Sequence, residues 1–349
     1  MDAPLHQPSV PASVAIVGAT GAVGQELVKC LEDRDFPVDR LKLLASPRSA
    51  GRTYPFKGAP VTVEAVSAEA FEGVDFAFFA AGATVSREFA PLATQAGALV
   101  IDNTSAFRME PSIPLVVPEV NAELLGAASR IIANPNCVAA ISAVPLAELA
   151  RISPLKRLIM ATYQSASGAG AAAMEELERA TRAALDGEPF EQKVMPHPYA
   201  FNIFSHNSAI EADTGYNGEE TKVMAELRKI LGVPELPVSA TCIRVPVLRA
   251  HSMAVTAEFE RPISPAEARE ALAKGRGLKL VDDAATNHYP MPNEASGIAD
   301  VLVGRIRTDL SDPSGRTLSF FCAGDQLLKG AALNAVQIAE AILDAQKAS

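Results

Sequence analysis

The order of apolar and polar residues in the first half of the chain predicts strands that alternate with helices. Short apolar runs occur at residues 14–17, 41–46, 74–81, 98–103 and 130–134. Helical stretches lie between them, as in QELVKCLEDRD, where Leu27, Val28 and Leu31 fall at helical spacing. This alternation predicts an α/β fold with a mostly parallel, doubly wound sheet.

A glycine-rich turn follows the first predicted strand. Residues 18–24 read GATGAVG, with the glycines spaced GxxGxxG, and a helical stretch follows directly. At such a junction the free backbone N–H groups and the helix dipole favour a pyrophosphate. Glycines also serve tight turns and close packing without a ligand, so the spacing alone leaves both interpretations open. The place of the turn, between the first strand and the first helix, favours a dinucleotide.

The end of the second predicted strand indicates which dinucleotide is bound. NAD-binding folds commonly place an Asp or Glu there to accept a hydrogen bond from the ribose 2′-hydroxyl. Here residues 45–49 read ASPRS and include no acid. Arg48 and Ser49 suit a 2′-phosphate instead, because a guanidinium offers bidentate geometry. We therefore expect NADP rather than NAD, the alternative being that Arg48 is an ordinary surface arginine.

Composition narrows the class of protein. The chain has 349 residues, 48% of them hydrophobic, which suits two domains at a prior of ~150 residues per domain. Its formal net charge is -10, which disfavours nucleic acid as a partner and leaves any anionic substrate to a few local cations. The first ten residues lack the features of a signal peptide, and no apolar run approaches the ~18 residues of a membrane span. We expect a cytoplasmic protein without membrane association.

The cysteines argue against both disulfides and a metal site. Four are present, in no CxxC or Cys/His spacing, so neither a disulfide framework nor a zinc cage is expected, and a reducing cytosol fits best. Cys30 lies within a helical stretch at core spacing, whereas Cys242 and Cys322 lie inside apolar, strand-like runs. We interpret these three as buried structural residues.

Cys137 has a different setting. It follows a predicted strand in IIANPNCV (131–138) and precedes the small-residue helix pattern VAAISAVPLAELA. Cys137 should therefore occupy the first turn of a helix, with Asn134 or Asn136 as the cap. A thiolate is the nucleophilic form of cysteine, and helix N-termini are a recognised setting for a lowered thiol pKa. The pattern predicts a catalytic nucleophile, the alternative being a core cysteine.

A hydride-carrying cofactor and a nucleophilic thiol together imply chemistry through a thioester, as in acyl reductases and aldehyde dehydrogenases. Such chemistry needs a proton donor and acceptor near pH 7, for which histidine is the first candidate. His251 is the best placed of the five histidines, in the β-branched stretch CIRVPVLRAHSMAVTAEFE, although a satisfied core histidine remains the alternative. On an unbroken strand Arg244 and His251 would lie on opposite faces, so we expect a break near Pro246.

Several motifs converge on one family. They are GATGAVG, SPRSAG, NTSAFRM, NPNC, YQSASGAG, RVPVLRAHS and GDQLLKGAALNAVQIAE. In this order they resemble the aspartate-semialdehyde dehydrogenase family over nearly the whole chain from Ser13 onward. That resemblance implies NADPH-dependent reductive dephosphorylation of L-aspartyl 4-phosphate to L-aspartate 4-semialdehyde. This is the branch step toward lysine (through diaminopimelate), threonine, methionine and isoleucine.

The resemblance also implies roles for individual residues. Cys137 would be the nucleophile and His251 the acid/base. The implied substrate contacts are Arg108, Asn136 and Lys222 for the phosphate, Gln164 for orientation beside the thiol, Glu219 for the amino group and Arg244 for the carboxylate. Glu219 is preferred to Glu220 because it lies three residues before Lys222. The implied NADP contacts are Gly18, Thr20, Gly21, Ala22, Val23, Arg48, Ser49, Ser167, Gly168 and Gln326.

The resemblance further implies a homodimer built from two-domain subunits. Residues 1–11 are expected to form a disordered leader. Residues 12–136, completed by a C-terminal helix at 328–349, would form a Rossmann-type NADP-binding domain. Residues 137–327, with strands such as LKRLIMATYQ (155–164), would form an α+β catalytic and dimerisation domain.

Two other functions are consistent with the residues. N-acetyl-glutamyl-phosphate reductase would share the thiol, the histidine and the nucleotide loop, but its substrate carries an acetylated amine. A non-catalytic NADP-binding sensor would retain the nucleotide loop and make Cys137 incidental. The acid at Glu219 distinguishes the first alternative, and the reactivity of the Cys137 thiol distinguishes the second.

Overall fold

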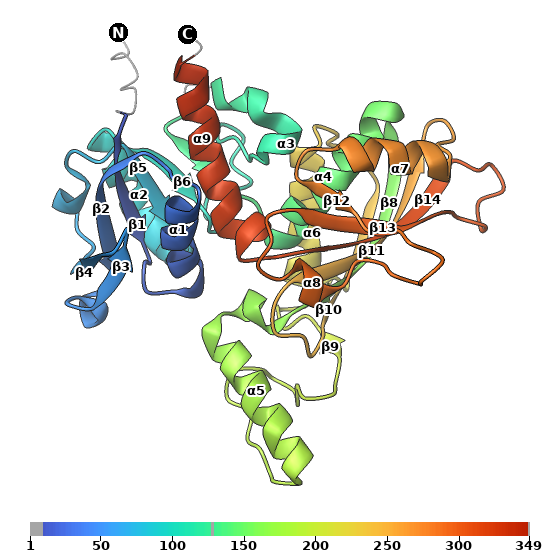
Figure 1. The fold of residues 1–349 in the computed structure, drawn as a ribbon, viewed down its shortest axis with the longest axis horizontal. Helices are drawn as coiled ribbons and strands as arrows, with labels where there is room; N and C mark the ends of the chain where they lie inside the picture. Colours follow the sequence, from blue (N-terminus) through green and yellow to red (C-terminus); the bar gives the residue numbers. More distant parts are fainter. Residues whose placement is uncertain (1–9, 127–128, 348–349) are drawn as a thin grey trace. The chain divides into compact units, whose positions relative to one another are not determined.

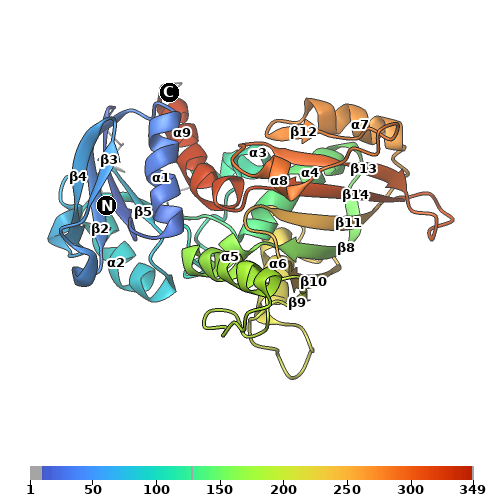
Figure 2. The same cartoon turned by 60° about the horizontal axis from the view of Figure 1, so that its bottom comes forward.

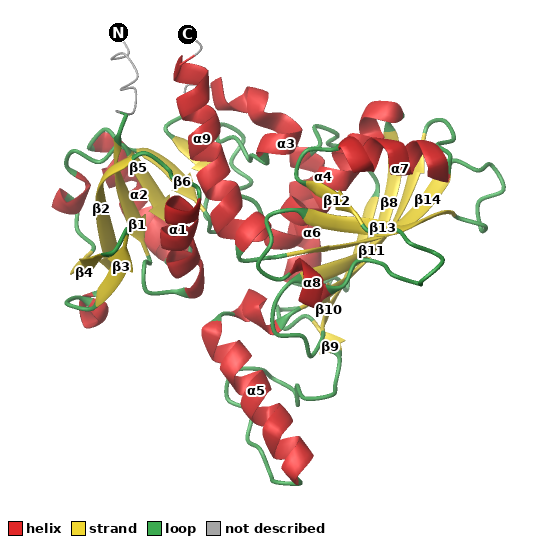
Figure 3. Ribbon diagram, in the orientation of Figure 1, coloured by secondary structure: helices red, strands yellow, loops and turns green. Residues whose placement is uncertain are grey.

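The computed structural model describes residues 10–126 and 129–347, so residues 1–9 of the expected leader lie outside the described part. The chain forms two compact units. Unit 1 comprises Met1–Asn136 and Ala331–Ser349, and unit 2 comprises Cys137–Gly330. Figure 1 labels their elements, and Figure 3 distinguishes helix from strand. Among the described residues, no helix is long and apolar enough to cross a membrane.

Unit 1 is built on a largely parallel sheet. Its strands are β1 (Ala12–Val17), β2 (Val38–Ala45), β3 (Thr53–Phe56), β4 (Ala59–Ala65), β5 (Phe76–Phe79), β6 (Leu99–Asp102) and β7 (Ile131–Ala133). Its α-helices are α1 (Ala22–Asp33), α2 (Ala83–Gln95), α3 (Pro118–Asn121) and α9 (Leu333–Lys347). In the described residues the strand order is β3-β4-β2-β1-β5-β6-β7, and β3 alone runs antiparallel to its neighbour.

The five strands expected from apolar runs are confirmed as β1, β2, β5, β6 and β7. Strand β1 is buried along its whole length, as a strand covered on both faces must be. One face carries Val17 and Phe79, which pack with Ala90 of α2. The other carries Phe76, whose ring lies 5.9 Å from Phe36, directly after α1.

The β3–β4 hairpin was not expected from the sequence. Its strands are short and mostly exposed, so their side chains do not show a clear alternation of apolar and polar residues. Both contain proline, which a sheet tolerates at its edge. At the other end of the chain, α9 packs beside α1 (Figure 1). The expected helix at 328–349 begins with a π-helical turn, Leu328–Ala332, before the α-helical part.

Unit 2 combines a mixed sheet with helices. Its strands are β8 (Leu155–Gln164), β9 (Phe204–Ser205), β10 (Val238–Arg244), β11 (His251–Phe259), β12 (Leu278–Leu280), β13 (Val301–Thr308) and β14 (Thr317–Gly324). Its α-helices are α4 (Cys137–Ile152), α5 (Ala171–Asp186), α6 (Gly218–Ile230), α7 (Pro265–Lys274) and α8 (Pro292–Ala295). In the described residues the strand order is β12-β13-β14-β11-β8-β10-β9. Within this unit, α5 projects away from the sheet in Figure 1 and comes toward the viewer in Figure 2.

The two faces of this sheet differ. Along β8 the buried Leu158, Met160 and Thr162 alternate with the exposed Ile159 and Tyr163. Helix α4 packs against β11, β13 and β14, and α6 packs against β10. Because side chains alternate along a strand, Gln164 at the end of β8 lies on the same buried face as Leu158. The ends of β8 and its neighbours therefore present polar groups on the buried face of the sheet.

Candidate active site

The residues singled out in the sequence fall into two sets, one in each unit. Unit 1 holds Gly18, Thr20, Gly21, Ala22, Val23, Arg48, Ser49, Arg108 and Asn136. Unit 2 holds Cys137, Gln164, Ser167, Gly168, Glu219, Lys222, Arg244, His251 and Gln326.

The glycine turn of unit 1 is built by close backbone packing. Gly18 has a φ of +90°, and a Cβ on it would lie 2.7 Å from the carbonyl carbon of Ala80. A Cβ on Gly24 would lie 2.2 Å from the carbonyl oxygen of Gly18. Larger residues therefore do not fit at either position, whether or not a ligand binds. The turn is therefore sterically required, and it also borders a pocket.

That pocket has a volume of about 560 Å³. Its lining residues are Val17, Gly18, Thr20, Gly21, Ala45, Ser46, Pro47, Val66, Ala80, Ala81, Val85 and Phe89. It lies where β1, β2 and β5 end, which is where doubly wound sheets bind nucleotides. The size suits a small-molecule site, and the apolar wall that includes Val66 and Phe89 suits a flat ring. Arg48 and Ser49 follow this lining directly in the turn Pro47–Ser49, and Arg48 is exposed.

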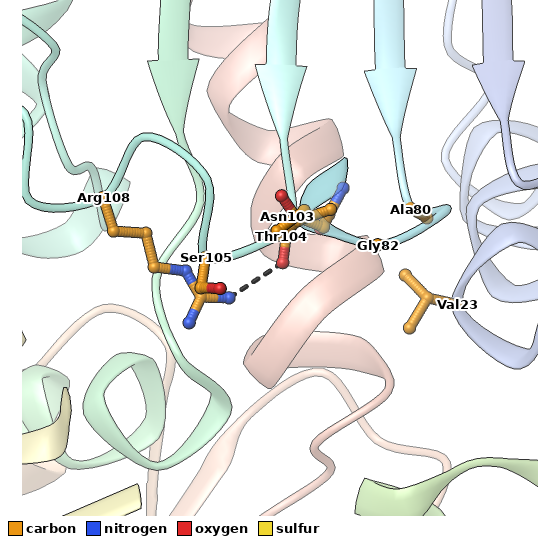
Figure 4. A pocket seen from close by; sticks show the side chains of 8 residues that line it. Val23, Ala80, Gly82, Asn103, Thr104, Ser105 and Arg108 are labelled. Carbon is orange, nitrogen blue, oxygen red and sulfur yellow. Dashed lines mark hydrogen bonds between the residues drawn. The ribbon is translucent and has the colours of Figure 1, made fainter. Parts of the chain in front are cut away.

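A second pocket of unit 1, of about 330 Å³, contains Arg108 (Figure 4). It is lined by Val23, Ala80, Gly82, Ala83, Asn103, Thr104, Ser105 and Arg108. The Arg108 Nε donates to the Asn134 carbonyl at 2.9 Å and one terminal nitrogen to the Asn103 carbonyl at 2.8 Å. These carbonyls follow β7 and β6, so two strand ends hold one guanidinium at the pocket wall. A fixed guanidinium of this kind suits a phosphate.

A buried acid shapes the same loop. Asp102 is fully buried at the end of β6 and accepts hydrogen bonds from the Ser86 hydroxyl and from the backbone and hydroxyl of Thr104. Burial raises the pKa of Asp102, although these hydrogen bonds act in the opposite direction. The carboxyl therefore fixes the start of the segment that leads to Arg108.

Cys137 is the first residue of α4, as the sequence predicts. It is half-buried, whereas the other three cysteines are buried, and burial raises the pKa of Cys30, Cys242 and Cys322 to about 12. Of the two residues predicted as the cap, Asn136 immediately precedes the helix, and Asn134 has other side-chain partners. Its amide nitrogen donates to Asn103 and Ala331, and its oxygen accepts from Asn334, so this side chain is engaged elsewhere.

In unit 2, three strand ends bring the predicted polar residues together. Strand β8 ends at Gln164, and the parallel strand β10 ends at Arg244, directly opposite it in register. Strand β11 begins at His251 and pairs with the other edge of β8. The break expected near Pro246 is confirmed, because residues 245–250 connect two separate strands. Arg244 and His251 consequently both lie on the buried face, despite their odd spacing in the sequence.

His251 is fully buried and oriented through one ring nitrogen. Its Nδ1 lies 3.0 Å from the backbone nitrogen of Ser165 and 3.1 Å from the Ser165 hydroxyl. Its Nε2 has no hydrogen-bond partner among the described residues. Burial, and then the nearby Arg244 and His206, lower the pKa of His251 well below its usual value. A Cβ on Gly168 would lie 2.9 Å from the ring, so the backbone at Gly168 packs against it.

Arg244 is held by three acceptors. Its Nε donates to Asn207 Oδ1 at 3.2 Å, one terminal nitrogen donates to the Ser165 carbonyl at 3.2 Å, and the other lies 2.8 Å from His206 Nε2. Burial first, and then Arg244, lower the pKa of His206 to about 4, so the ring is neutral and accepts. Sequence reasoning missed His206 because its stretch is irregular. Only the pairing of β9 with β10, which sets Phe204 opposite Arg244, places it here.

Two adjacent acids at the start of α6, Glu219 and Glu220, have different hydrogen-bond partners. Glu220 accepts from the backbone N–H of Asn217 and of Cys242, both at 2.9 Å, so it caps the helix and ties it to β10. Glu219 accepts from the Gln164 amide at 3.1 Å. Lys222 is exposed, yet close enough to affect the pKa of His206. Glu219 is thus in hydrogen-bond contact with a predicted site residue, Gln164, whereas the printed partners of the Glu220 carboxylate within the described chain are backbone N–H groups.

Gln326 connects the thiol region with His251. A Cβ on Gly330 would lie 2.8 Å from the Cβ of Cys137 and 3.2 Å from that of Gln326, so Gly330 separates these two residues. The Gln326 oxygen accepts from the Ala250 backbone N–H at 3.0 Å, next to His251. Ser167 in turn bonds to Ser165 through their hydroxyls at 2.9 Å. Unit 2 thus combines a thiol at a helix N-terminus, a neutral imidazole, a fixed guanidinium and a carboxylate.

Comparison with protein families gives two matches. Residues 13–128 match the model described as semialdehyde dehydrogenase, NAD binding domain. Residues 145–329 match the model described as semialdehyde dehydrogenase, dimerisation domain.

Individual relatives and solved structures agree with these matches. An aspartate-semialdehyde dehydrogenase of Synechocystis sp. is 51% identical over 334 residues, 96% of this chain and 98% of the relative. One from Bacillus subtilis is 46% identical over 337 residues, 94% and 96% of the two chains. The crystal structure of aspartate semialdehyde dehydrogenase II from Vibrio cholerae has a TM-score of 0.92 at 41% identity, covering 97% of this chain and 99% of that one. The Vibrio cholerae enzyme has also been solved in complex with ASA.

Proposed function

The chain belongs to the aspartate-semialdehyde dehydrogenase family, and on that premise we propose how its own residues carry out the reaction. It is an oxidoreductase of amino-acid biosynthesis that uses a nicotinamide dinucleotide. The reaction converts L-aspartyl 4-phosphate to L-aspartate 4-semialdehyde and phosphate. The observation that carries the assignment of roles is the convergence of Gln164, Arg244 and His251 at three strand ends in the unit that contains Cys137.

Cys137 is the nucleophile in this proposal. Its thiolate attacks the acyl carbon, the C–O bond to phosphate breaks, and a thioester to Cys137 remains. The position at the N-terminus of α4 favours the negative charge on sulfur. When bound, a nicotinamide dinucleotide would supply hydride to the acyl carbon. When the C–S bond then breaks, Cys137 is released as the thiolate together with the aldehyde, and His251 is the acid/base group of the site.

The substrate's other groups are assigned by charge. Arg244 meets the carboxylate and the buried Glu219 meets the ammonium, while Gln164, hydrogen-bonded to Glu219, orients the acyl group. The phosphate contacts we propose are Arg108, Asn136 and Lys222. Preorganised cations of this kind stabilise a departing phosphate. A buried carboxylate at Glu219 favours a free amine and disfavours an acetylated one, which would leave the charge unpaired.

For the cofactor we propose NADP. The glycine turn at 18–23 and the adjoining pocket suit a dinucleotide, and Gly21 of this turn is exposed. Arg48 and Ser49 would hold the 2′-phosphate, since residues 45–49 include no acid to accept from a ribose hydroxyl. From unit 2, Ser167, Gly168 and Gln326 would complete the contacts. The buried Gln326 Nε2, without a partner among the described residues, is available to an amide of the ligand.

Assembly and location complete the proposal. We propose a homodimer in which the open face of the unit 2 sheet is covered by the partner. That face carries the exposed Ile159 and Tyr163, and the Tyr163 ring packs against Phe321 at 6.1 Å. Exposed large apolar side chains on one face of a sheet are typical of a contact surface. We propose the cytoplasm as the location, because four cysteines in no CxxC or Cys/His spacing fit a reducing compartment.

The test of function is NADP reduction by aspartate semialdehyde in the presence of phosphate. The parent enzyme should show a phosphate-dependent rise in NADPH absorbance. Cys137→Ala should abolish it while NADP binding, measured by fluorescence titration, changes little, because the nucleotide contacts lie elsewhere. Undiminished turnover in Cys137→Ala would remove the thioester route. Iodoacetamide labelling of Cys137 at neutral pH separates an enzyme from a sensor with an incidental cysteine.

A further inference from the structure

Thr162 and Gln164 form a hydrogen-bonded pair of side chains on the buried face of β8. They lie two residues apart, so their side chains point to the same face of the sheet, and both are at most 1% exposed. The Thr162 hydroxyl donates to Gln164 Oε1 at 3.0 Å. Strand β8 pairs with β10 on one side and with β11 on the other, and the Val245 N–H donates to the Gln164 carbonyl. The backbone that carries the pair is therefore fixed on both sides.

The contacts of the Gln164 side chain distinguish the two ends of its amide. Nε2 donates to Glu219 Oε1 at 3.1 Å, and an ionised carboxylate only accepts. Oε1 accepts from the Thr162 hydroxyl. Turning the amide by half a rotation would set its oxygen against the carboxylate of Glu219. The amide therefore has one favoured orientation, with its oxygen toward Thr162 and its nitrogen toward Glu219.

The surroundings of the Thr162 hydroxyl determine where its proton points. Cys242 lies opposite Thr162 in the register of β10 and β8. Burial raises the pKa of Cys242 to about 12, so this residue remains a thiol. Sulfur is a weak acceptor, whereas an amide carbonyl oxygen is a strong one. Gln164 Oε1 is therefore the better acceptor for the Thr162 proton.

One of the two side-chain N–H groups of Gln164 is left for a ligand. Nε2 carries two hydrogens, and its acceptor within the described chain is Glu219. Because Gln164 is buried and buried donors are rarely left unpaired, the second N–H indicates an acceptor that arrives with the substrate. The last torsion of a glutamine side chain has a broad minimum, so a contact at the amide oxygen is needed to hold that N–H in one direction.

We propose that Thr162 is a positioning residue, whose hydroxyl holds the Gln164 amide so that one N–H pairs with Glu219 and the other donates to an oxygen of the substrate's acyl group. This inference rests on the proposed function and deepens it, because it names what fixes the group that orients the substrate. Without the hydroxyl, the amide oxygen would be buried without a donor, and rotation to find one would turn the N–H away from the substrate. Thr162 thus acts on the reaction only through Gln164.

Two substitutions separate the hydroxyl of Thr162 from its shape. Thr162→Val keeps the branched shape and removes the hydroxyl, whereas Thr162→Ser keeps the hydroxyl. We expect Thr162→Val to lower kcat/KM for aspartate semialdehyde by about five- to tenfold, the scale of one neutral hydrogen bond, and Thr162→Ser to stay within about twofold of the parent. The loss in Thr162→Val should divide between kcat and KM as it does in Gln164→Ala. Unchanged kcat/KM in Thr162→Val, or equal losses in Thr162→Val and Thr162→Ser, would overturn the proposal.

A double-mutant cycle tests whether Thr162 acts through Gln164. Adding Thr162→Val to Gln164→Ala should cause no further loss of kcat/KM, since the amide that Thr162 orients is then absent. Losses that multiply in the double variant would show that Thr162 acts independently of Gln164, and the positioning role would be wrong.

Urea unfolding of the same four proteins gives a measurement that does not depend on the reaction. The effects of the two substitutions on stability should also be non-additive, because either one removes the 3.0 Å contact between Thr162 and Gln164. Additive effects on stability would contradict the contact on which the proposal depends. If Cys137→Ala stayed active, the proposed function would fail while the coupling in stability remained.

Discussion

Gln326 holds Ala250 in an unusual backbone conformation. The side-chain oxygen of Gln326 accepts the Ala250 N–H at 3.0 Å, and Ala250 has a φ of +71°. That region costs a non-glycine residue of the order of 1 kcal/mol, so surrounding contacts must stabilise it. Because Ala250 immediately precedes His251, the same contact also helps to position the His251 side chain.

We expect Gln326→Ala to lower the free energy of unfolding by about 1–3 kcal/mol, because it leaves a buried N–H without an acceptor. The loss of position at His251 should lower kcat in the same variant. Urea unfolding and steady-state rates measure both effects. Gln326→Glu is the control, since it keeps an oxygen for Ala250, and stability in Gln326→Ala equal to the parent would contradict the prediction.

Arg48 is predicted to select the cofactor. Arg48→Ala should weaken NADPH binding by about 1.5–3 kcal/mol, as expected for loss of a charge-assisted hydrogen bond, and should change NADH binding little. Titration with each cofactor measures the difference. Arg52→Ala, a change at a nearby exposed arginine, is the matched control. Equal losses for NADPH and NADH would make Arg48 an ordinary surface residue.

Substitutions of the adjacent acids Glu219 and Glu220 in α6 should have different effects on activity and stability. Glu219→Gln should reduce kcat/KM for aspartate semialdehyde with little effect on stability, because it removes the charge assigned to the ammonium. Glu220→Gln should instead lower the free energy of unfolding by about 1–2 kcal/mol, since Glu220 accepts two backbone N–H groups. Activity assays and urea denaturation of both variants test this difference. If Glu219→Gln lost stability and Glu220→Gln lost activity, the roles assigned to the two acids would be exchanged.

The role assigned to Glu219 also leads to a prediction about which substrate the enzyme prefers. The parent enzyme should prefer aspartate semialdehyde to N-acetyl-glutamate semialdehyde by about a hundredfold or more in kcat/KM, the scale of rejection by unpaired polar groups. Glu219→Gln should narrow that ratio mainly through a poorer reaction with the aspartate substrate. Comparable rates on both aldehydes in the parent would favour the acetylated alternative.

His206 predicts a pH dependence of stability. Its pKa falls from 6.5 to about 4 on folding, so between these values the unfolded state binds more protons than the native state. The contribution of neutral His206 to the free energy of unfolding is therefore complete above pH 6.5 and is lost as pH falls toward 4. The urea midpoint should decrease from pH 7 to pH 5 in the parent and decrease less in His206→Asn, whose amide oxygen still accepts from Arg244. An equal decrease in both proteins would contradict the role.

Features that depend on residues close together in the chain could be predicted from the amino-acid sequence. Apolar runs predicted five strands of unit 1, and the glycine spacing predicted the turn at Gly18, whose neighbours leave no space for a Cβ. The motif before Cys137 predicted its place at a helix start. Each of these features depends on local steric contacts or on the periodicity of side chains. Both can be recognised in a segment of about ten residues.

Tertiary structure decided what depends on strands far apart in the chain. Arg244 and His251 share a face only because β10 and β11 lie on opposite sides of β8, and His206 reaches Arg244 only because β9 pairs with β10. The different roles of Glu219 and Glu220 could be assigned only from the structure, because Glu220 accepts a hydrogen bond from the backbone N–H of Cys242 in β10. His251 Nδ1 contacts the main-chain N–H of Ser165, 86 residues earlier, and such a group leaves no trace in the side-chain pattern because every residue except proline has one.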